Sequence, residues 1–261
     1  MSERIETLAV VARMVDYGEA DRVVTLLTEQ RGRVSAMARN ARRSRRRFGG
    51  ALSLFVVGQA TLQQRRRSEL LLLEGFRCCE DLAPAISSDV VKVAHGSYLL
   101  ELTREIWPAD APDRRLFDLA CEGLRALAGH PPNPALLRAF ELQLLAVAGL
   151  APSLQHCVRC GAAATASPMG FSVSAGGVIC QGCGPHGWPF SAALQRQLLD
   201  LLEMPLAPAA ETTISRETAH QARELLWMLV RHHLGKELRT LAFIAQLAGY
   251  PRLPDGGELD R

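Results

Sequence analysis

Residues 22–38 read RVVTLLTEQRGRVSAMA, and this stretch decides the fold of the N-terminal part of the chain. Its first half, Arg22–Thr28, is rich in Val, Leu and Thr, and its second half, Arg33–Ala38, places Val and Ala on one face. The intervening Gln30-Arg31-Gly32 has the composition of a hairpin turn. The pattern therefore predicts two antiparallel strands joined by a tight turn.

Three further strand-like runs surround this hairpin, at Ile5–Met14, Leu52–Gln63 and Glu69–Cys78. Five short strands in about 80 residues, with no helical period among them, favour a small closed barrel of the oligonucleotide-binding (OB) kind over an open sheet whose edges need cover. We therefore predict an OB-fold domain at residues 1–80.

Beyond Ser87 the apolar period becomes helical, with breaks at proline and glycine. Helices are expected at Asp89–Trp107, Leu116–Ala128, Pro134–Gly149, Ala192–Glu203, from Ser215 to Gly235, and at Leu238–Ala248, with a linker around Pro205 and Pro208. The predicted fold class is an OB barrel followed by an all-α domain at 81–250, with a zinc module inserted at 152–189 and a flexible tail at 251–261.

The composition excludes several classes of protein. The 261 residues are 48% hydrophobic and 22% charged, which suits a globular chain and not a disordered one. No apolar run approaches the length of a membrane-spanning helix, and the N-terminus lacks the basic and apolar pattern of a secretory signal. We expect a cytoplasmic protein with no membrane partner.

The formal net charge of +3 is unevenly distributed. Residues 1–80 hold 15 arginines against nine acidic residues, and the stretch 31–47 contains eight arginines and no acid. Three more arginines follow at the next turn. This pattern favours phosphate contact by one rim of the barrel, and a solvated surface loop without a ligand is the alternative. The predicted DNA-binding residues are Arg31, Arg33, Arg39, Arg42, Arg43, Arg45, Arg46, Arg47, Arg65, Arg66 and Arg67.

Aromatic residues make up only 5% of the chain, so backbone contact should dominate over base stacking. Tyr17, Phe48, Phe55 and Phe76 are the stacking candidates in the barrel. Phe48 stands out because two glycines follow it, although an anchor in the core is an equal alternative.

Two Cys-x2-Cys pairs, Cys157/Cys160 and Cys180/Cys183, stand 19 residues apart. Each pair can wrap one side of a metal ion, and together they supply the four thiolates of a tetrahedral structural zinc site. Disulfides and a catalytic redox role are the weaker alternatives. Cys78, Cys79 and Cys121 are expected to be buried small hydrophobic residues.

No enzymatic motif is present: the chain lacks a phosphate-binding loop, a dinucleotide-binding glycine pattern and a metalloprotease helix. Asp16, Glu19 and Asp21 cluster, but neighbouring arginines explain them by ion pairing and turn capping. We expect a binding protein with no catalytic residues. An RNA-binding protein of translation or RNA processing is the rival to a DNA-binding one.

Four segments resemble the RecO family of bacterial recombination mediators. They are Asp16–Thr28, Gly32–Val34 with Ala38–Arg43, Arg47–Leu52, and Arg231–Arg239, and the likeness spans about residues 4–248. It implies an OB domain, a helical domain and a zinc module. It also implies binding of single- and double-stranded DNA, annealing of complementary strands, and loading of RecA together with RecR. Further implied partners are RecF and the acidic tail of the single-stranded-DNA-binding protein.

Overall fold

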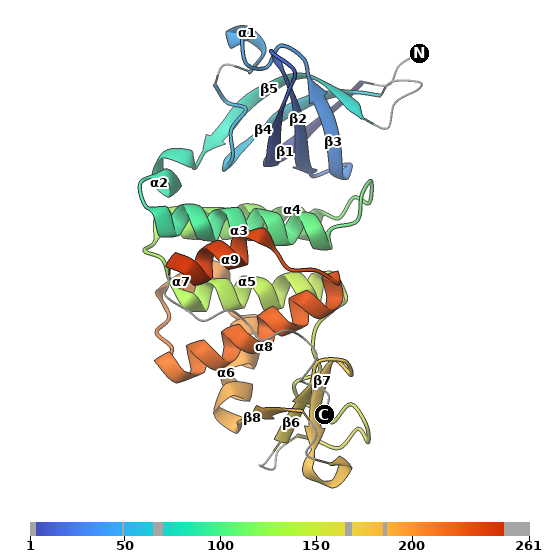
Figure 1. The fold of residues 1–261 in the computed structure, drawn as a ribbon, viewed down its shortest axis with the longest axis vertical. Helices are drawn as coiled ribbons and strands as arrows, with labels where there is room; N and C mark the ends of the chain where they lie inside the picture. The colour runs from blue at the N-terminus through green and yellow to red at the C-terminus, as the bar shows by residue number, and fades with distance from the viewer. Residues whose placement is uncertain (1–3, 49, 65–69, 165–168, 185–186, 248–261) are drawn as a thin grey trace. The chain divides into compact units, whose positions relative to one another are not determined.

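The computed structural model describes residues 4–48, 50–64, 70–164, 169–184 and 187–247 (Figure 1), with Arg45 and Arg46 described by their backbone only. The chain divides into two compact units, Met1–Pro131 and Pro132–Arg261. The first unit combines the N-terminal sheet with three helices that follow it, and the second contains the remaining helices and the cysteine module. This arrangement of a five-stranded sheet, a helical part and clustered cysteines confirms the predicted fold class.

Five strands form the N-terminal sheet. They are β1 (Arg4–Tyr17), β2 (Asp21–Thr28), β3 (Gly32–Ala38), β4 (Val56–Gln63) and β5 (Leu71–Asp81). Each strand pairs with two neighbours in the order β1-β2-β3-β5-β4, and β4 pairs back with β1, so the sheet closes on itself as a barrel. All pairs are antiparallel except β3 with β5, which is parallel.

Every second side chain along the strands points inward, and these apolar side chains fill the interior of the sheet. Val24, Ala36 and Leu71 lie on three successive strands and are at most 3% exposed. A bulge between Val11 and Arg13 lets the long β1 bend while it keeps its pairing with both β2 and β4. The result is one apolar core that the residues 22–38 hairpin helps to line, as its alternation predicted.

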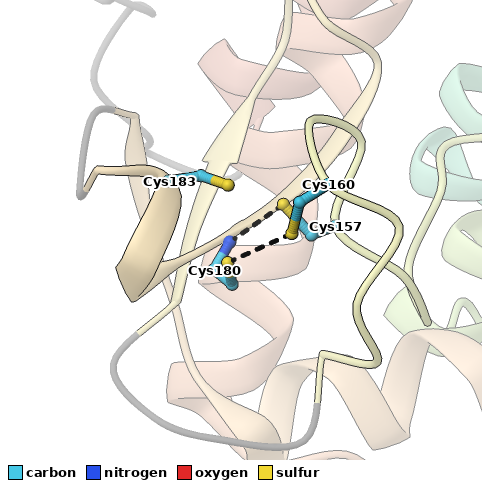
Figure 2. Close-up of side chains that lie close together, drawn as sticks. All are labelled: Cys157, Cys160, Cys180 and Cys183. Carbon is cyan, nitrogen blue, oxygen red and sulfur yellow. Dashed lines mark hydrogen bonds between the residues drawn. The ribbon is translucent and has the colours of Figure 1, made fainter.

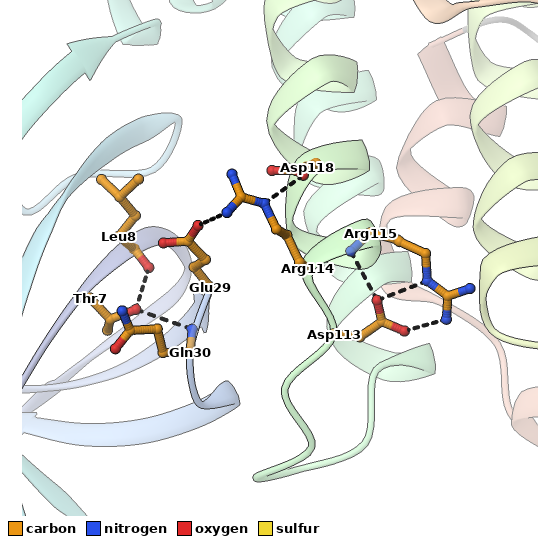
Figure 3. A network of polar contacts seen from close by, with 8 residues as sticks. All are labelled: Thr7, Leu8, Glu29, Gln30, Asp113, Arg114, Arg115 and Asp118. Carbon is orange, nitrogen blue, oxygen red and sulfur yellow. Dashed lines mark hydrogen bonds and ion pairs between the residues drawn. The ribbon is translucent and has the colours of Figure 1, made fainter.

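Besides the short α1 (Arg45–Phe48) between β3 and β4, three helices complete the first unit: α2 (Ala83–Ser87), α3 (Val90–Ile106) and α4 (Arg114–Gly129). Asp89 and Asp113 cap α3 and α4, each accepting hydrogen bonds from backbone N–H groups of the first turn. The segment between these helices packs on the β2–β3 turn. There Glu29 pairs with Arg114 at 2.9 Å, and Gln30 donates its backbone N–H to the Thr7 hydroxyl (Figure 3).

Gly32 makes this packing possible. Its φ of +65° lies in the left-handed region, and a Cβ at this position would come within 2.4 Å of the Ala111 carbonyl oxygen. Only glycine satisfies both conditions without displacing the backbone. The β2–β3 turn therefore packs closely against the α3–α4 segment because position 32 has no side chain.

The second unit contains five helices among its described residues: α5 (Pro134–Val147), α6 (Ala192–Glu203), α7 (Leu206–Glu211), α8 (Arg216–Leu234) and α9 (Arg239–Leu247). The predicted helices are confirmed within a few residues at each end, and Gly235 terminates α8 with a φ of +64°. The predicted linker around Pro205 and Pro208 is wrong, because a short helix, α7, forms there. Residues 251–261 lie outside the described part of the chain.

Candidate nucleic-acid interface and metal centre

The strand register separates the predicted arginines into two groups. Arg22 pairs with Ala38, whereas Thr28 pairs with Gly32, so β2 and β3 have one end beside Arg39 and the opposite end beside Arg31 and Arg33. The expectation that all these arginines share one rim is therefore wrong for Arg31 and Arg33. A hairpin reverses the chain direction, and this places the start and the end of β3 at opposite ends of the sheet.

Arg33 has a structural partner. Its half-buried guanidinium donates from Nε to the backbone carbonyl of Trp107 at 2.9 Å, and its backbone bridges to Ala109. These contacts join β3 to the segment after α3. Arg33 therefore stabilises the first unit whether or not nucleic acid is bound.

Residues 39–44, the basic loop, follow β3 at the opposite end and are fixed to the β1–β2 turn by backbone hydrogen bonds. Asn40 donates its backbone N–H to Asp21 Oδ1 at 2.7 Å, and Arg42 donates its own to the Ala20 carbonyl at 3.1 Å. Asn40 has a φ of +54°, which asparagine tolerates better than most residues. Two segments that are separate in sequence thus form one edge, in which the arginines of the basic loop lie beside the carboxylates of the β1–β2 turn.

Apart from a 2.9 Å pair between Arg22 and Asp16, the ion pairs within this edge are long and exposed. Arg42 lies 3.8 Å from Asp16 and Arg43 lies 3.8 Å from Glu19, with Arg43 and Glu19 at 70% and 92% side-chain exposure. Such pairs contribute little, typically about 0–1 kcal/mol, and solvent screens them. They orient the guanidinium groups without removing them from reach of a phosphate. This geometry agrees with the prediction that the acidic cluster serves ion pairing and capping.

Beside the basic loop the surface is hollowed, with a volume of about 800 Å³. Cationic groups and apolar side chains both line it: Met14, Arg22, Arg42, Arg43, Phe48 and Leu52 are among them. Arg22 was not among the predicted DNA-binding residues, although its place directly after the acidic turn was a usable signal. The hollow therefore has both cationic and apolar lining residues.

Phe48 is a core residue and not an exposed stacking group. It is 2% exposed, lies at the end of α1 (Arg45–Phe48) and packs in the apolar core of the sheet. Arg47 lies over its ring at 5.3 Å and donates from Nη2 to the Arg39 carbonyl at 2.6 Å, while remaining exposed. The side chains of Arg45 and Arg46, and the whole of Arg65, Arg66 and Arg67, lie outside the described residues.

The four cysteines of the two Cys-x2-Cys pairs converge on one point (Figure 2). Their sulfur atoms all lie within 4.8 Å of one another, and Sγ of Cys160 is 3.7 Å from Sγ of Cys180. Four sulfurs bound tetrahedrally to zinc at about 2.3 Å are roughly 3.8 Å apart. The cluster therefore fits the donor set and the size of a four-thiolate zinc site.

The electrostatics of the cluster also suit a cation. Hydrogen bonds from backbone N–H groups, first that of Cys180, lower the pKa of Cys157 to about 6. Hydrogen bonding with the Cys160 and Cys180 sulfurs raises the pKa of Cys183 to about 12. Four adjacent sulfurs cannot all carry negative charge unless a cation neutralises them, and a divalent metal would do so.

Short local structure brings the two pairs together. β6 (Met169–Ser172) and β7 (Gly177–Cys180) form a hairpin that carries Cys180 at its end, and β8 (Trp188–Phe190) adds a third strand. Gly161, with a φ of +73°, donates its N–H to the Cys157 carbonyl and closes the first knuckle. A hairpin therefore lies between the two pairs and positions Cys180 beside the first pair.

The remaining cysteines differ from one another. Cys121 is buried as expected, and burial raises the pKa of its thiol to about 12. The expected burial of Cys78 and Cys79 is wrong, since both are exposed. They lie where β5 continues past the core, beside the bulge that shifts its pairing with Val57 and Gly58.

No helix within the described ranges is both long enough and apolar enough to cross a membrane.

The protein combines a small closed sheet, a helical part and a four-cysteine cluster. The arginines at one edge of the sheet are typical of a nucleic-acid-binding protein. The comparisons with known proteins specify the class. A family model for the N-terminal part of recombination protein O matches residues 1–80, and one for its C-terminal part matches residues 87–242.

Relatives named DNA repair protein RecO match nearly the whole chain. That of Anaeromyxobacter dehalogenans (strain 2CP-C) is 43% identical over 94% of this chain and 97% of its own length. Those of Myxococcus xanthus and Geobacter sulfurreducens are each 36% identical, over 94% and 92% of this chain and 98% and 96% of their own length. The chain belongs to the RecO family of DNA repair proteins.

Proposed function

We propose that this protein binds single- and double-stranded DNA through the basic edge of its N-terminal sheet and anneals complementary strands. With RecR it would then help to load RecA during recombinational repair. The observation that carries the proposal is the fixed basic loop, which holds Arg39, Arg42 and Arg43 exposed beside the hollow. Family membership supports DNA over RNA as the ligand.

Annealing by such a surface needs no covalent chemistry. Two complementary strands repel each other through their phosphates, and a surface rich in guanidinium groups lowers that repulsion. Phosphate contacts do not depend on base sequence, so the bases stay available to find their complement. The loop arginines, with Arg47 and the predicted Arg45, Arg46 and Arg65–Arg67, would supply these contacts.

The protein partners are proposed from the family alone. RecR would be the direct partner, RecF and RecA would be reached indirectly, and the acidic tail of the single-stranded-DNA-binding protein would recruit the molecule to coated DNA. We assign no residues to these interfaces. A cytoplasmic, nucleoid-associated location follows from the proposed work on chromosomal DNA.

A strand-annealing assay tests the proposal. Two complementary labelled strands, coated with single-stranded-DNA-binding protein, are mixed with the full-length protein in the presence and absence of RecR. We expect annealing by the wild type and a large loss for Arg39→Ala, Arg42→Ala, Arg43→Ala. The control is Arg196→Ala, Arg216→Ala, which removes two exposed arginines of the second unit, and it is compared with the double variant Arg42→Ala, Arg43→Ala as well. Equal annealing by the basic-loop variants and the control would refute the assignment.

The cysteine cluster would hold one structural zinc ion through Cys157, Cys160, Cys180 and Cys183. Bound zinc would tie the two knuckles together and leave no position open for a substrate. Elemental analysis should find one zinc per chain. Cys157→Ser, Cys160→Ser should remove the metal and loosen residues 152–189, as limited proteolysis would show, whereas Cys78→Ser, Cys79→Ser should leave the metal in place. A metal-loaded Cys157→Ser, Cys160→Ser protein would refute the site.

A further inference from the structure

An apolar row crosses the outer face of the N-terminal sheet. Val15 pairs with Val23, Val23 with Met37, and Met37 with Leu72, so one residue from each of β1, β2, β3 and β5 lies in register. Their neighbours Val24, Ala36 and Leu71 belong to the core, and alternation therefore turns the row outward. At the usual spacing between strands the row is roughly 14 Å long.

Tyr17 stands at one end of this face, on the tip of the β1–β2 hairpin. Tyr17 is 60% exposed and Val15 is 44% exposed. Among the described residues of the five strands, these are the two large hydrophobic side chains that are exposed. Neither is needed for the core, so the fold does not explain why apolar side chains occupy this surface.

Arginines border the row on both sides. Arg13 is exposed and lies in the next row, in register with Thr25 and Ser35. On the other side, beyond the Tyr17–Asp21 pair, the exposed Arg39 opens the basic loop. The loop is held against this same hairpin by the hydrogen bonds of Asn40 and Arg42. An apolar strip with cations beside it matches a strand whose bases stack through their flat faces and whose phosphates are anionic.

We propose that this outer face binds the bases of an unpaired DNA strand, with Tyr17 stacking on one base while Arg13 and Arg39 hold the adjoining phosphates. The inference rests on the proposed DNA binding and adds which form of DNA the face selects. In a duplex the bases are stacked inside the helix and cannot lie on the ring. The contact therefore favours single strands, whereas the basic loop binds both forms.

A single exposed ring also suits annealing. Each base that stacks on an aromatic side chain increases the affinity for the strand, so a surface with many aromatic rings would release the strand slowly. With one ring, the strand is oriented on the face and can still be released to its complement. Tyr17 is thus a DNA-contacting residue that confers preference for a single strand without sequence selection.

Tyr17→Ala tests this directly in the full-length protein. We expect binding of an oligothymidylate of about 30 nucleotides to weaken roughly five- to tenfold, the lower range for loss of one stacked base. Binding of a duplex of the same length, and the salt dependence of both, should stay unchanged because no charge is removed. Tyr17→Phe should keep wild-type affinity. No loss, or an equal loss for both forms of DNA, would overturn the proposal.

Phe243→Ala is the matched control, since Phe243 is an aromatic residue of the second unit that is 42% exposed. It should bind both forms of DNA as the wild type does. Arg39→Ala, Arg42→Ala, Arg43→Ala is measured in parallel to separate the two proposals. If this variant weakens both forms and Tyr17→Ala weakens neither, the basic edge stands and the stacking face fails. If the arginine variant also binds normally, the proposed function itself fails.

Photo-crosslinking identifies the contact itself. A single strand that carries iododeoxyuridine should crosslink to the tryptic peptide Met14–Arg22, whose one aromatic residue is Tyr17. The crosslink should vanish in Tyr17→Ala and persist in Phe243→Ala. A crosslink confined to other peptides would overturn the proposal. So would normal strand binding by Tyr17→Ala combined with a loss of RecR binding, which would make the face a protein interface.

Discussion

Arg33 and Arg39 come from one run of arginines, yet they lie at opposite ends of β3 and have different surroundings. Arg33 is half-buried and donates to the Trp107 carbonyl, whereas Arg39 is exposed at the start of the basic loop. The end of the sheet at Arg33 is closed by the α3–α4 segment, and the end at Arg39 is open beside the hollow. A charge run in a sequence is therefore not one surface, because strand register assigns its members to packing or to binding.

The largest effect should come from reversing charge at the open end. Arg42→Glu, Arg43→Glu replaces two phosphate-binding groups by repelling ones, and we expect DNA affinity to fall more than about 100-fold at moderate salt. The control Arg196→Glu, Arg216→Glu changes the net charge equally in the second unit and should lose much less. Fluorescence anisotropy with labelled DNA measures both, and similar losses would mean that net charge alone governs binding.

At the closed end the largest effect should be on stability. Gly32→Ala forces a Cβ against the Ala111 carbonyl at a φ of +65°, and we expect a loss of about 2–4 kcal/mol in the free energy of unfolding of the first unit. Gly18 has a similar φ of +61°, but a Cβ added there would meet no atom within 4 Å. Gly18→Ala should therefore cost only about 1 kcal/mol. Equal losses of unfolding free energy for the two variants in chemical denaturation would contradict the close packing of the β2–β3 turn against Ala111.

Arg33→Ala and Arg39→Ala should give opposite results. Removal of Arg33 leaves the Trp107 carbonyl without its donor, so we expect about 1–2 kcal/mol less stability and unchanged DNA affinity. Removal of Arg39 should leave stability within about 0.5 kcal/mol and weaken DNA binding. Denaturation and anisotropy on the same two proteins decide whether the division between the ends is real.

The Asp113 carboxyl makes the stability of the closed end depend on pH. Hydrogen bonds from the Arg115 side chain hold the pKa of this carboxyl below its ordinary value. The folded-state pKa is lowered, so the stabilisation is present above the unfolded-state pKa and is lost as pH falls through the folded one. Asp113→Asn keeps the helix cap, and its deficit in stability should shrink toward zero as the solution is acidified. A deficit that persists in acid would contradict this.

The smallest effect should come from the pair between Glu29 and Arg114. The Arg114 side chain is 73% exposed and also contacts Asp118, so solvent screens both interactions. Glu29→Gln should lower stability by about 0.5 kcal/mol or less. A loss above that of Arg33→Ala would show that the ion pair, and not the Arg33 hydrogen bond, holds the closed end together.

Local patterns are enough to predict the strands, most helices and the cysteine cluster. Cys157 and Cys160 form one knuckle within a single turn, so spacing alone indicates what they do. The helix α7 escapes prediction because proline usually breaks a helix. Pro205 precedes α7 and Pro208 lies in its first turn, where the missing N–H has no partner to lose.

Properties that depend on pairing between distant segments cannot be predicted in this way. The separation of Arg33 from Arg39 follows from the register of β2 with β3, and the outward row at Val15 and Met37 follows from the register of three strand pairs. Burial of Phe48 follows from closure of the sheet over its own interior. Each depends on packing between residues far apart in the chain.

The salt dependence of DNA binding tests the central claim most directly, because its slope counts the phosphates that each end of the sheet neutralises. Against duplex DNA, Arg39→Ala, Arg42→Ala, Arg43→Ala should reduce the slope of log affinity against log salt by roughly 2.7, or about 0.9 for each phosphate that is no longer neutralised. Arg33→Ala should leave the slope at the wild-type value. A flattened slope for Arg33→Ala, or an unchanged slope for the triple variant, would contradict the account.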